Sequence, residues 1–185
     1  IKAAANPGLE QWKINQMMLA AMTLPRAENE SEESFVRRVQ TDSREHARKA
    51  AETGTEIHAA IEKSFSGHPP EYPMVNDAIG DHFGDLKWSA EKSFSSMMGF
   101  GGKVDLHSSD SGGVVIDFKT KEFTKESEDK AAIFDEHAMQ LAAYRVGLNL
   151  PHARCAIVFV STIEDLVVVK ELEEEHVVRG WEMFY

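Results

Sequence analysis

The segment Gly101 to Lys121 carries two carboxylates and a lysine among residues that ought to be buried. Its sequence is GGKVDLHSSDSGGVVIDFKTK, with Asp105 and Asp117 in apolar runs on either side of a Ser/Asp/Gly turn. Lys119 follows Asp117 by two residues. Burying a carboxylate is costly unless another group compensates its charge. We therefore expect a compensating group close to both aspartates.

The turn predicts how the two carboxylates face each other. A three-residue loop, Asp110 to Gly112, would place Gly112 at the position that needs a positive φ. An antiparallel ladder centred on this loop sets Asp105 directly opposite Asp117, with Cβ atoms about 5 Å apart. Lys119 shares that face because strand side chains alternate.

Two carboxylates at that distance repel, and one would stay protonated unless a cation lies between them. A divalent cation accepts hard oxygen ligands and would remove the repulsion. The ammonium of Lys119 could then orient a nucleophile and stabilise charge that develops on a phosphate. The simpler alternative is a buried ion pair between Lys119 and one aspartate.

A predicted helix upstream could add an imidazole to this site. His58 and Glu62 lie four residues apart in GTEIHAAIE and therefore share one helical face. A single histidine on a helix is usually an ordinary surface or core residue. Beside an acidic metal cluster, however, an imidazole nitrogen is a common ligand.

Glu91 is a further charge in a strand that should be half-buried, within the segment KWSAEKSF. Strand alternation allows Glu91 to point into the site. The opposite face would then hold Trp88, Ala90, Lys92 and Phe94.

The segment MQLAAYR places Gln140 and Tyr144 one helical turn apart. Their apolar neighbours fit ordinary packing, so the pair alone is a weak signal. The alternative to ordinary packing is that Gln140 and Tyr144 contact the site.

The elements that must position these residues follow from periodicity and turn signals. Helical spacing occupies 9–22, and Ser31 could cap a long helix that runs to Gly54 and continues or kinks into 55–65. A loop at 66–73 and a helix at 74–86 follow. The β-like segments are 87–94, 101–107, 113–120, 153–162 and 166–172, with helices at 130–149 and 173–184.

This order predicts an α/β fold with a mixed central β-sheet flanked by helices, plus an N-terminal helical region. We expect a single domain over 1–185, with the helical region at 1–66 and a sheet-containing core at 75–185. The length of 185 residues suits one hydrophobic core.

Composition narrows the class of protein. The hydrophobic share of 42% and the charged share of 28% are typical of a globular protein, and no apolar run approaches the roughly 20 residues that span a bilayer. A lone cysteine, Cys155, excludes an internal disulfide, a cysteine-rich zinc site and an iron–sulfur cluster. We expect a cytoplasmic protein without a signal peptide.

The net charge of −11 argues against non-specific coating of nucleic acid, although a metal-binding carboxylate cluster adds negative charge itself. Arg37, Arg44 and Arg48 lie close to one face of the long helix. They form either a solvated face with ion pairs, such as Arg38 with Asp42, or a stripe that tracks phosphates.

Five motifs occur in a fixed order: GTEIH, SAE, GGKVDL, VVIDFKTK and QLAAY, over residues 54–146. In this order they resemble the RecB-type branch of the PD-(D/E)XK nuclease superfamily, which has a restriction-endonuclease-like core. The likeness is greatest to the phage and mitochondrial-genome-maintenance type of single-strand DNA exonuclease. The related CRISPR-associated proteins hold an iron–sulfur cluster through four cysteines, so one cysteine excludes that subgroup.

The resemblance implies a role for each motif residue. His58, Asp105, Asp117 and the backbone carbonyl of Phe118 would bind Mg²⁺ or Mn²⁺. Lys119 would be the catalytic lysine. The further acidic residue would be Glu91, and the residues that position DNA or water would be Gln140 and Tyr144.

We therefore expect a hydrolase, a metal-dependent DNA exonuclease in phage or bacterial recombination, repair or replication. The alternatives are a structure-specific endonuclease and a catalytically silent DNA-binding module. Its partner would be DNA with single-stranded or duplex ends, together with a single-strand-binding or annealing protein. Candidate phosphate contacts are Arg37, Arg44, Arg48, Lys103, Lys121 and Lys125, and Phe123 could stack a base or fill the core.

Overall fold

The computed structural model describes residues 7–185, so the first six residues of the expected N-terminal region lie outside it. The chain divides into two compact units, Ile1–Thr55 and Glu56–Tyr185. The boundary falls inside helix α2 (Glu32–Phe65), not after it.

The first unit consists of α1 (Pro7–Thr23) and the first part of α2, as the helical spacing predicts. The Ser31 hydroxyl caps α2 by accepting a hydrogen bond from the N–H of Ser34 at 3.2 Å. The helix then runs through Gly54 without interruption. Arg38 does not pair with Asp42 as predicted, because its guanidinium donates two bonds of 2.8 Å to Glu30.

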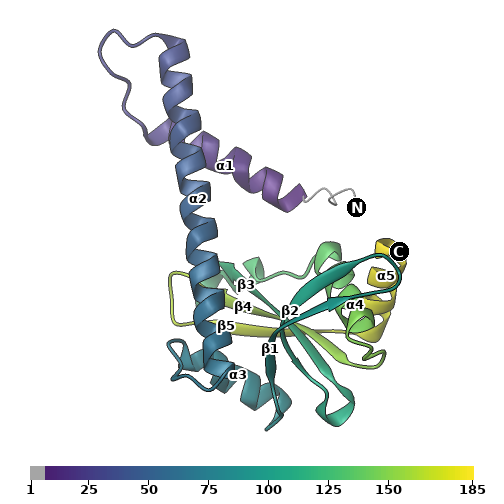
Figure 1. Ribbon diagram of the computed structural model, residues 1–185. Helices are drawn as coiled ribbons and strands as arrows, with labels where there is room; N and C mark the ends of the chain where they lie inside the picture. Colours follow the sequence, from purple (N-terminus) through teal and green to yellow (C-terminus); the bar gives the residue numbers. More distant parts are fainter. Residues whose placement is uncertain (1–6) are drawn as a thin grey trace. The chain divides into compact units, whose positions relative to one another are not determined.

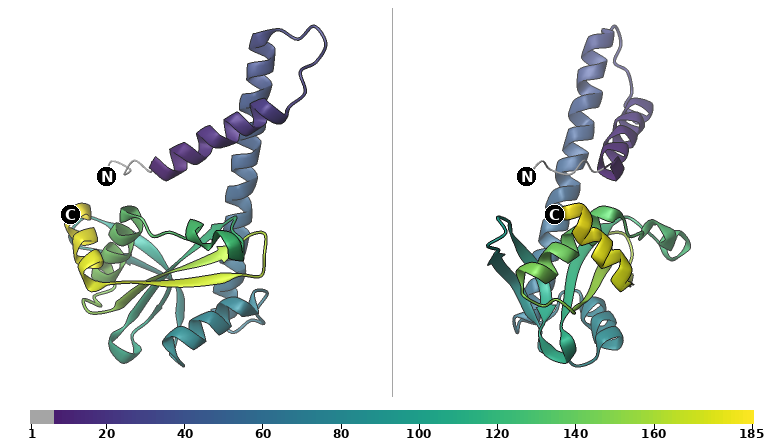
Figure 2. Two further views of the ribbon diagram at one scale, coloured as in Figure 1. Left: turned by 180° about the vertical axis from the view of Figure 1, so that it is seen from behind. Right: turned by 90° about the vertical axis from the view of Figure 1, so that its right-hand side faces the viewer.

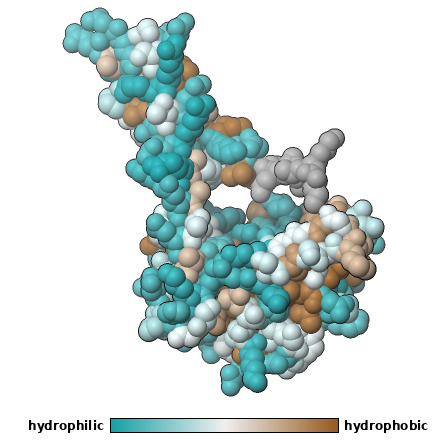
Figure 3. Space-filling view, viewed as in Figure 1, coloured by the Kyte–Doolittle hydropathy of each residue, from teal (hydrophilic) through white to brown (hydrophobic). Residues whose placement is uncertain are grey.

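Apolar side chains gather at the surface of α1 (Figure 3). Among its residues 9–23 only Ala20 is buried, whereas Met18 and Met22 are 59% and 81% exposed. A groove of about 300 Å³ lies between α1 and α2 within this unit and is lined almost wholly by apolar side chains. It contains none of the residues with predicted chemistry.

The second unit is built on a five-stranded sheet in the order β1-β2-β3-β4-β5 (Figure 1). Adjacent strands of the sheet are antiparallel, except β3 and β4, which are parallel to each other. A parallel pair needs a long crossover, and helix α4 (Asp135–Gly147) supplies it. The strands are β1 (Ser89–Ser95), β2 (Gly101–Ser108), β3 (Val114–Lys121), β4 (Arg154–Ser161) and β5 (Val167–Leu172).

Helices cover both faces of the sheet, each over its own hydrophobic cluster. On one face Leu141 of α4 and Val177 of α5 (Glu174–Phe184) pack against the strands. On the other face Ile61 of α2 and Ile79 of α3 (Pro73–Phe83) do so. Figure 2 shows α4 and α5 side by side, where Arg145 forms a bidentate ion pair with Glu174. The predicted α/β fold with a mixed sheet and flanking helices is confirmed.

One helix boundary differs from the prediction of a helix over 130–149. A short 3₁₀ helix occupies Lys125–Lys130, and α4 begins only at Asp135. Phe134 has an extended backbone with φ of −121° and ψ of 164°, which ends any helix before it. The alanines at 131 and 132 raise helical propensity locally, but tertiary packing overrides it, since Ala131 is fully buried.

Phe123 lies in the hydrophobic core with no exposed surface, so the suggestion that it stacks a base is wrong. Its carbonyl accepts a 2.6 Å hydrogen bond from the Ser161 hydroxyl, which fixes the chain after β3. Among residues 7–185, no helix combines the length and apolar character needed to cross a membrane.

Candidate metal centre

The hairpin between β2 and β3 has the predicted register. Leu106 pairs with Ile116, and Ser108 with Val114, so an antiparallel ladder does centre on the loop. Gly112 has a φ of 89°, as the turn requires. The ladder stops at Leu106, however, so the direct pairing of Asp105 with Asp117 is absent from it.

In both β1 and β2, the side chains that should lie on one face of the sheet pass to the other face, and they do so at the same point along the paired strands. Val104 packs in the cluster under α4, whereas Leu106, two residues later, packs in the cluster under α2 and α3. On β1, Ala90 and Phe94 are divided between the same two clusters. Regular alternation would keep each pair on one face, so the predicted common face for Trp88, Ala90, Lys92 and Phe94 is wrong.

The change of face coincides with an unusual backbone at Glu91. Its φ of 55° is in the left-handed region, which a residue with a side chain rarely adopts. The flanking pairs, Ala90 with Leu106 and Lys92 with Val104, set Glu91 opposite Asp105. Strained positions of this kind persist only where the surroundings impose them, and they cluster at functional sites.

The distortion brings Asp105 to the face that carries α2. Its Oδ2 accepts the N–H of Phe118 at 2.9 Å, which replaces the next backbone bond of the ladder. The same oxygen lies 3.7 Å from Nδ1 of His58. The imidazole also packs edge-on against the Phe118 ring, with centroids 6.1 Å apart.

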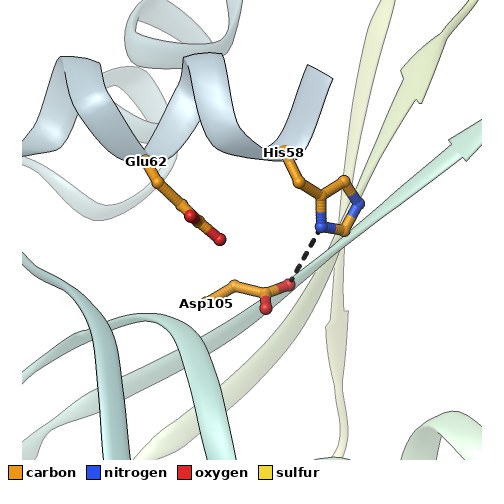
Figure 4. Close-up of side chains that lie close together, drawn as sticks. All are labelled: His58, Glu62 and Asp105. Atoms are coloured by element: carbon orange, nitrogen blue, oxygen red, sulfur yellow. Dashed lines mark ion pairs between the residues drawn. The ribbon is translucent and has the colours of Figure 1, made fainter. Parts of the chain in front are cut away.

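His58, Glu62 and Asp105 form a three-ligand cluster (Figure 4). One ligand atom from each lies within 4.8 Å of the other two. The helical spacing of four residues turns the first two side chains to the same side of α2, and the third comes from β2. All three side chains are only partly buried, so an ion could reach them from solvent.

The electrostatics of the cluster favour a bound cation. Burial lowers the pKa of His58, the Asp105 carboxylate opposes this, and the Lys119 charge adds to the lowering, so the net shift favours the neutral imidazole that binds metals. Burial and the neighbouring Glu91 carboxylate raise the pKa of Glu62 to about 8. The Glu91 carboxylate is itself paired with Lys103, and its hydrogen bond with Glu62 lowers the pKa of Glu91.

Asp117 and Lys119 form an ion pair on the face of β3 that α4 covers. Asp117 is 1% exposed, and its Oδ2 contacts the ammonium without hydrogen-bond geometry, which leaves this oxygen unsatisfied. Burial and the charge of Asp105 together raise the pKa of Asp117 to about 6, although the ammonium of Lys119 opposes the rise. The ion pair expected as the simpler alternative is therefore present, and the charge of Lys119 partly compensates the buried carboxylate.

A chain of hydrogen bonds links Lys119 to α4. Its ammonium donates to Oε1 of Gln140 at 3.3 Å, and Nε2 of Gln140 donates to the Tyr144 hydroxyl at 2.7 Å. Burial raises the pKa of Tyr144 to about 12, so its hydroxyl keeps its proton and can donate it to another group. The two α4 residues thus belong to the site's surroundings rather than to ordinary packing alone.

The structure does not gather every predicted residue around the cluster. Asp117 is not among its three ligands, and the backbone N–H of Phe118 donates to Asp105. Lys121 donates to the carbonyl of Lys130 at 2.9 Å. The three predicted arginines, Arg37, Arg44 and Arg48, belong to the other unit.

Arg48 fits the solvated alternative for the arginine stripe. Its guanidinium pairs with Glu45 at 2.7 Å and with Glu52 at 2.6 Å within α2. Because two neighbouring carboxylates offset the charge of Arg48, this residue is less suited to bind a phosphate. The roles of Arg37 and Arg44 stay predictions.

Glu62 is the site residue that sequence reasoning did not assign as a ligand. Its signal was present, since it shares a helical face with His58. The sequence analysis predicted Asp117, two residues before Lys119, as a ligand instead. Only the distortion at Glu91 and Asp105, which no local pattern predicts, brings β2 within reach of Glu62.

Comparisons with known proteins assign no family to the chain. No family model matches it, and no curated protein matches it. The solved structure of SSO0001 is similar with a TM-score of 0.41 and 14% identity, over 95% of this chain and 85% of that chain. Function must therefore be inferred from the residues of the site.

Proposed function

We propose that this protein is a divalent-metal-dependent deoxyribonuclease of the RecB-type PD-(D/E)XK branch. The observation that carries the proposal is the convergence of His58, Glu62 and Asp105, with the Asp117–Lys119 pair within electrostatic range. An imidazole, carboxylates and an ammonium together suit hydrolysis of a phosphodiester. The motif order in the sequence supports the same assignment.

The residues present fit Mg²⁺ or Mn²⁺. Two carboxylates and one imidazole offer hard oxygen ligands and a borderline nitrogen, a set that suits these ions better than thiophilic metals. Oδ2 of Asp117, which contacts the Lys119 ammonium, is a further acceptor within electrostatic range of Asp105. When bound, the cation would supply Lewis-acid polarisation of a phosphoryl oxygen and would lower the pKa of water.

The chain's own residues have separable roles in this proposal. Lys119 stabilises negative charge that develops on the phosphate, because its ammonium is partly exposed and lies beside the acidic residues. Gln140 holds that ammonium in place through its Oε1 atom. Tyr144 accepts from Gln140 and can donate its own proton to a phosphate oxygen or to water.

The resemblance supplies the finer parts of the proposal. It favours an exonuclease that acts on single-stranded or duplex DNA ends in recombination, repair or replication. It also suggests a single-strand-binding or annealing protein as a partner, in the cytoplasm of a bacterial or phage-infected cell.

The test is a time course on oligonucleotides labelled at the 5′ or the 3′ end, single-stranded and duplex, with Mg²⁺, Mn²⁺ or EDTA. We expect metal-dependent ladders that shorten from one end, and none in EDTA. Lys119→Ala should lower the rate by at least about 100-fold, since loss of one preorganised charge-stabilising group has that scale. Lys92→Ala, an exposed lysine of β1, is the matched control and should cleave at the parent rate.

The other outcomes separate the alternatives. Internal cuts in circular DNA would identify an endonuclease on the same metal centre. Binding of DNA without cleavage in either metal would identify a silent DNA-binding module. Equal rates for the parent and Lys119→Ala would contradict the role of the lysine.

A further inference from the structure

Phe134 is a large aromatic side chain that the hydrophobic core does not use. It lies immediately before α4 and is 45% exposed. The ammonium of Lys121 lies 5.1 Å from its ring centroid, and the His137 ring lies 5.7 Å away at an interplanar angle of 55°. The ring is thus supported by its neighbours while much of its surface stays open.

The backbone beneath this ring is fixed as well. Nδ1 of His137 accepts the N–H of Phe134 at 3.1 Å, and the imidazole packs against Phe159 with centroids 6.1 Å apart. Burial lowers the pKa of His137 to about 4, so the acceptor nitrogen stays unprotonated at neutral pH. A ring held in this way loses little conformational entropy when a ligand binds to it.

Lys121 is part of this arrangement. Its ammonium donates to the Lys130 carbonyl at 2.9 Å and lies over the Phe159 ring at 5.8 Å. Glu136, in the first turn of α4, lies within electrostatic range of that ammonium and offsets its charge. A supported aromatic surface with balanced charge suits a neutral, flat group better than a phosphate.

The position of the ring relative to the proposed metal centre is set by two elements. Lys119 and Lys121 alternate onto the same face of β3, about 7 Å apart. On α4, Gln140 contacts Lys119 and lies five residues, about 7.5 Å along the helix axis, after the first helical residue, which Phe134 directly precedes. Since stacked nucleotides advance about 3.4 Å each along a strand, this backbone separation corresponds to two or three nucleotides between a phosphate at Lys119 and a base at the ring.

We propose that Phe134 is a stacking platform for one unpaired base of the DNA strand being cut. The inference rests on the proposed nuclease function and deepens it. A base inside a duplex has both faces covered by its neighbours, so it cannot stack on this ring. The strand must therefore be single-stranded where it leaves the metal centre, and Lys121 serves to hold the ring.

The test uses 12-nucleotide single strands that carry 2-aminopurine at successive positions, because stacking quenches its fluorescence. Binding is measured in Mg²⁺ on the Lys119→Ala background to limit cleavage. We expect quenching at one position only, absent in duplexes of the same sequence. Phe134→Ala should abolish this quenching and weaken binding about 5- to 150-fold, and Phe134→Trp should restore both.

Matched variants separate stacking from folding. Phe134→Leu keeps an apolar side chain without a flat ring, so it should fold but not quench. Tyr185→Ala removes another exposed aromatic, 75% exposed and stacked on Trp181, and should bind like the parent. Far-ultraviolet circular dichroism of each variant reports whether α4 is retained.

The outcomes for the platform and for the nuclease are distinguishable. If wild-type protein degrades DNA but Phe134→Ala or Phe134→Leu quenches and binds like the parent, the platform is overturned and the nuclease stands. If wild-type protein degrades no DNA but shows quenching that depends on Phe134, the platform stands and hydrolysis fails. If no single strand binds, the platform is overturned, and the nuclease is then overturned only if duplex DNA is not degraded either.

Discussion

Glu62 determines how the metal-free cluster responds to pH. Its folded-state pKa of about 8 exceeds the ordinary value of 4.5, so the protonated form stabilises the fold. That stabilisation is fully present below pH 4.5 and is lost as the pH rises towards 8. In EDTA, thermal unfolding should therefore occur at lower temperature at pH 9 than at pH 5.

Replacement of Glu62 by Gln should change stability and metal affinity in opposite directions. Gln mimics the protonated acid, so Glu62→Gln should lose less stability than the parent between pH 5 and pH 9 in EDTA. It should also bind Mn²⁺ at least about ten-fold more weakly, because a ligand charge is lost. Titration calorimetry measures the second effect. Unchanged Mn²⁺ affinity would remove Glu62 from the ligand set.

Glu91 offers a test of the backbone strain beside the site. Glu91→Gly and Glu91→Ala both remove the carboxylate that pairs with Lys103, but only Gly adopts a φ of 55° without strain. Gly should therefore be the more stable of the two by about 1 kcal/mol in urea unfolding. In a regular strand Ala is the more stable residue, and that result would contradict the strained conformation.

At the scale of elements, most of the hairpin could be predicted from local sequence. The Ser/Asp/Gly loop fixes the register, and Leu106 does pair with Ile116 as the loop requires. The face of Asp105 could not be predicted in this way. It depends on the change of face in β1 and β2, which arises from packing against α4 on one side and α2 on the other.

The packing of α4 on α5 depends on close approach at Gly180. A Cβ at this position would lie 2.5 Å from the carbonyl oxygen of Ala138, so the helices would have to separate. Gly180→Ala should therefore destabilise the protein by about 1–3 kcal/mol. The matched control is Gly80→Ala in α3, where nothing lies within 4 Å and better helix propensity should stabilise by up to about 1 kcal/mol. Equal effects in urea unfolding would contradict the close approach.

At the scale of the whole molecule, the strand and helix order was sufficient to predict the fold class. Strands β1 to β5 and helix α5 lie within one or two residues of the expected segments, because their apolar runs and turns are local signals. The division at Thr55 was not predicted, since α2 is continuous through Gly54. Helical periodicity shows where a helix runs but not which neighbours each part of it contacts.

The division implies that the second unit carries the metal centre by itself. All three cluster residues and both hydrophobic clusters of the sheet lie within Glu56–Tyr185. A protein of residues 56–185 should therefore unfold cooperatively and bind Mn²⁺ within about three-fold of the full chain's affinity. Calorimetric titration of both proteins checks this. A folded fragment that binds no Mn²⁺ would show that residues 1–55 contribute to the site.

The central claim is that one helix and one distorted hairpin hold a hard divalent cation beside Lys119. The most direct measurement is anomalous diffraction from crystals soaked in Mn²⁺. The account predicts a peak bounded by His58, Glu62 and Asp105, weakened or lost in crystals of Glu62→Gln. Well-ordered crystals with no peak there, and with the two carboxylates turned away from the imidazole, would contradict it.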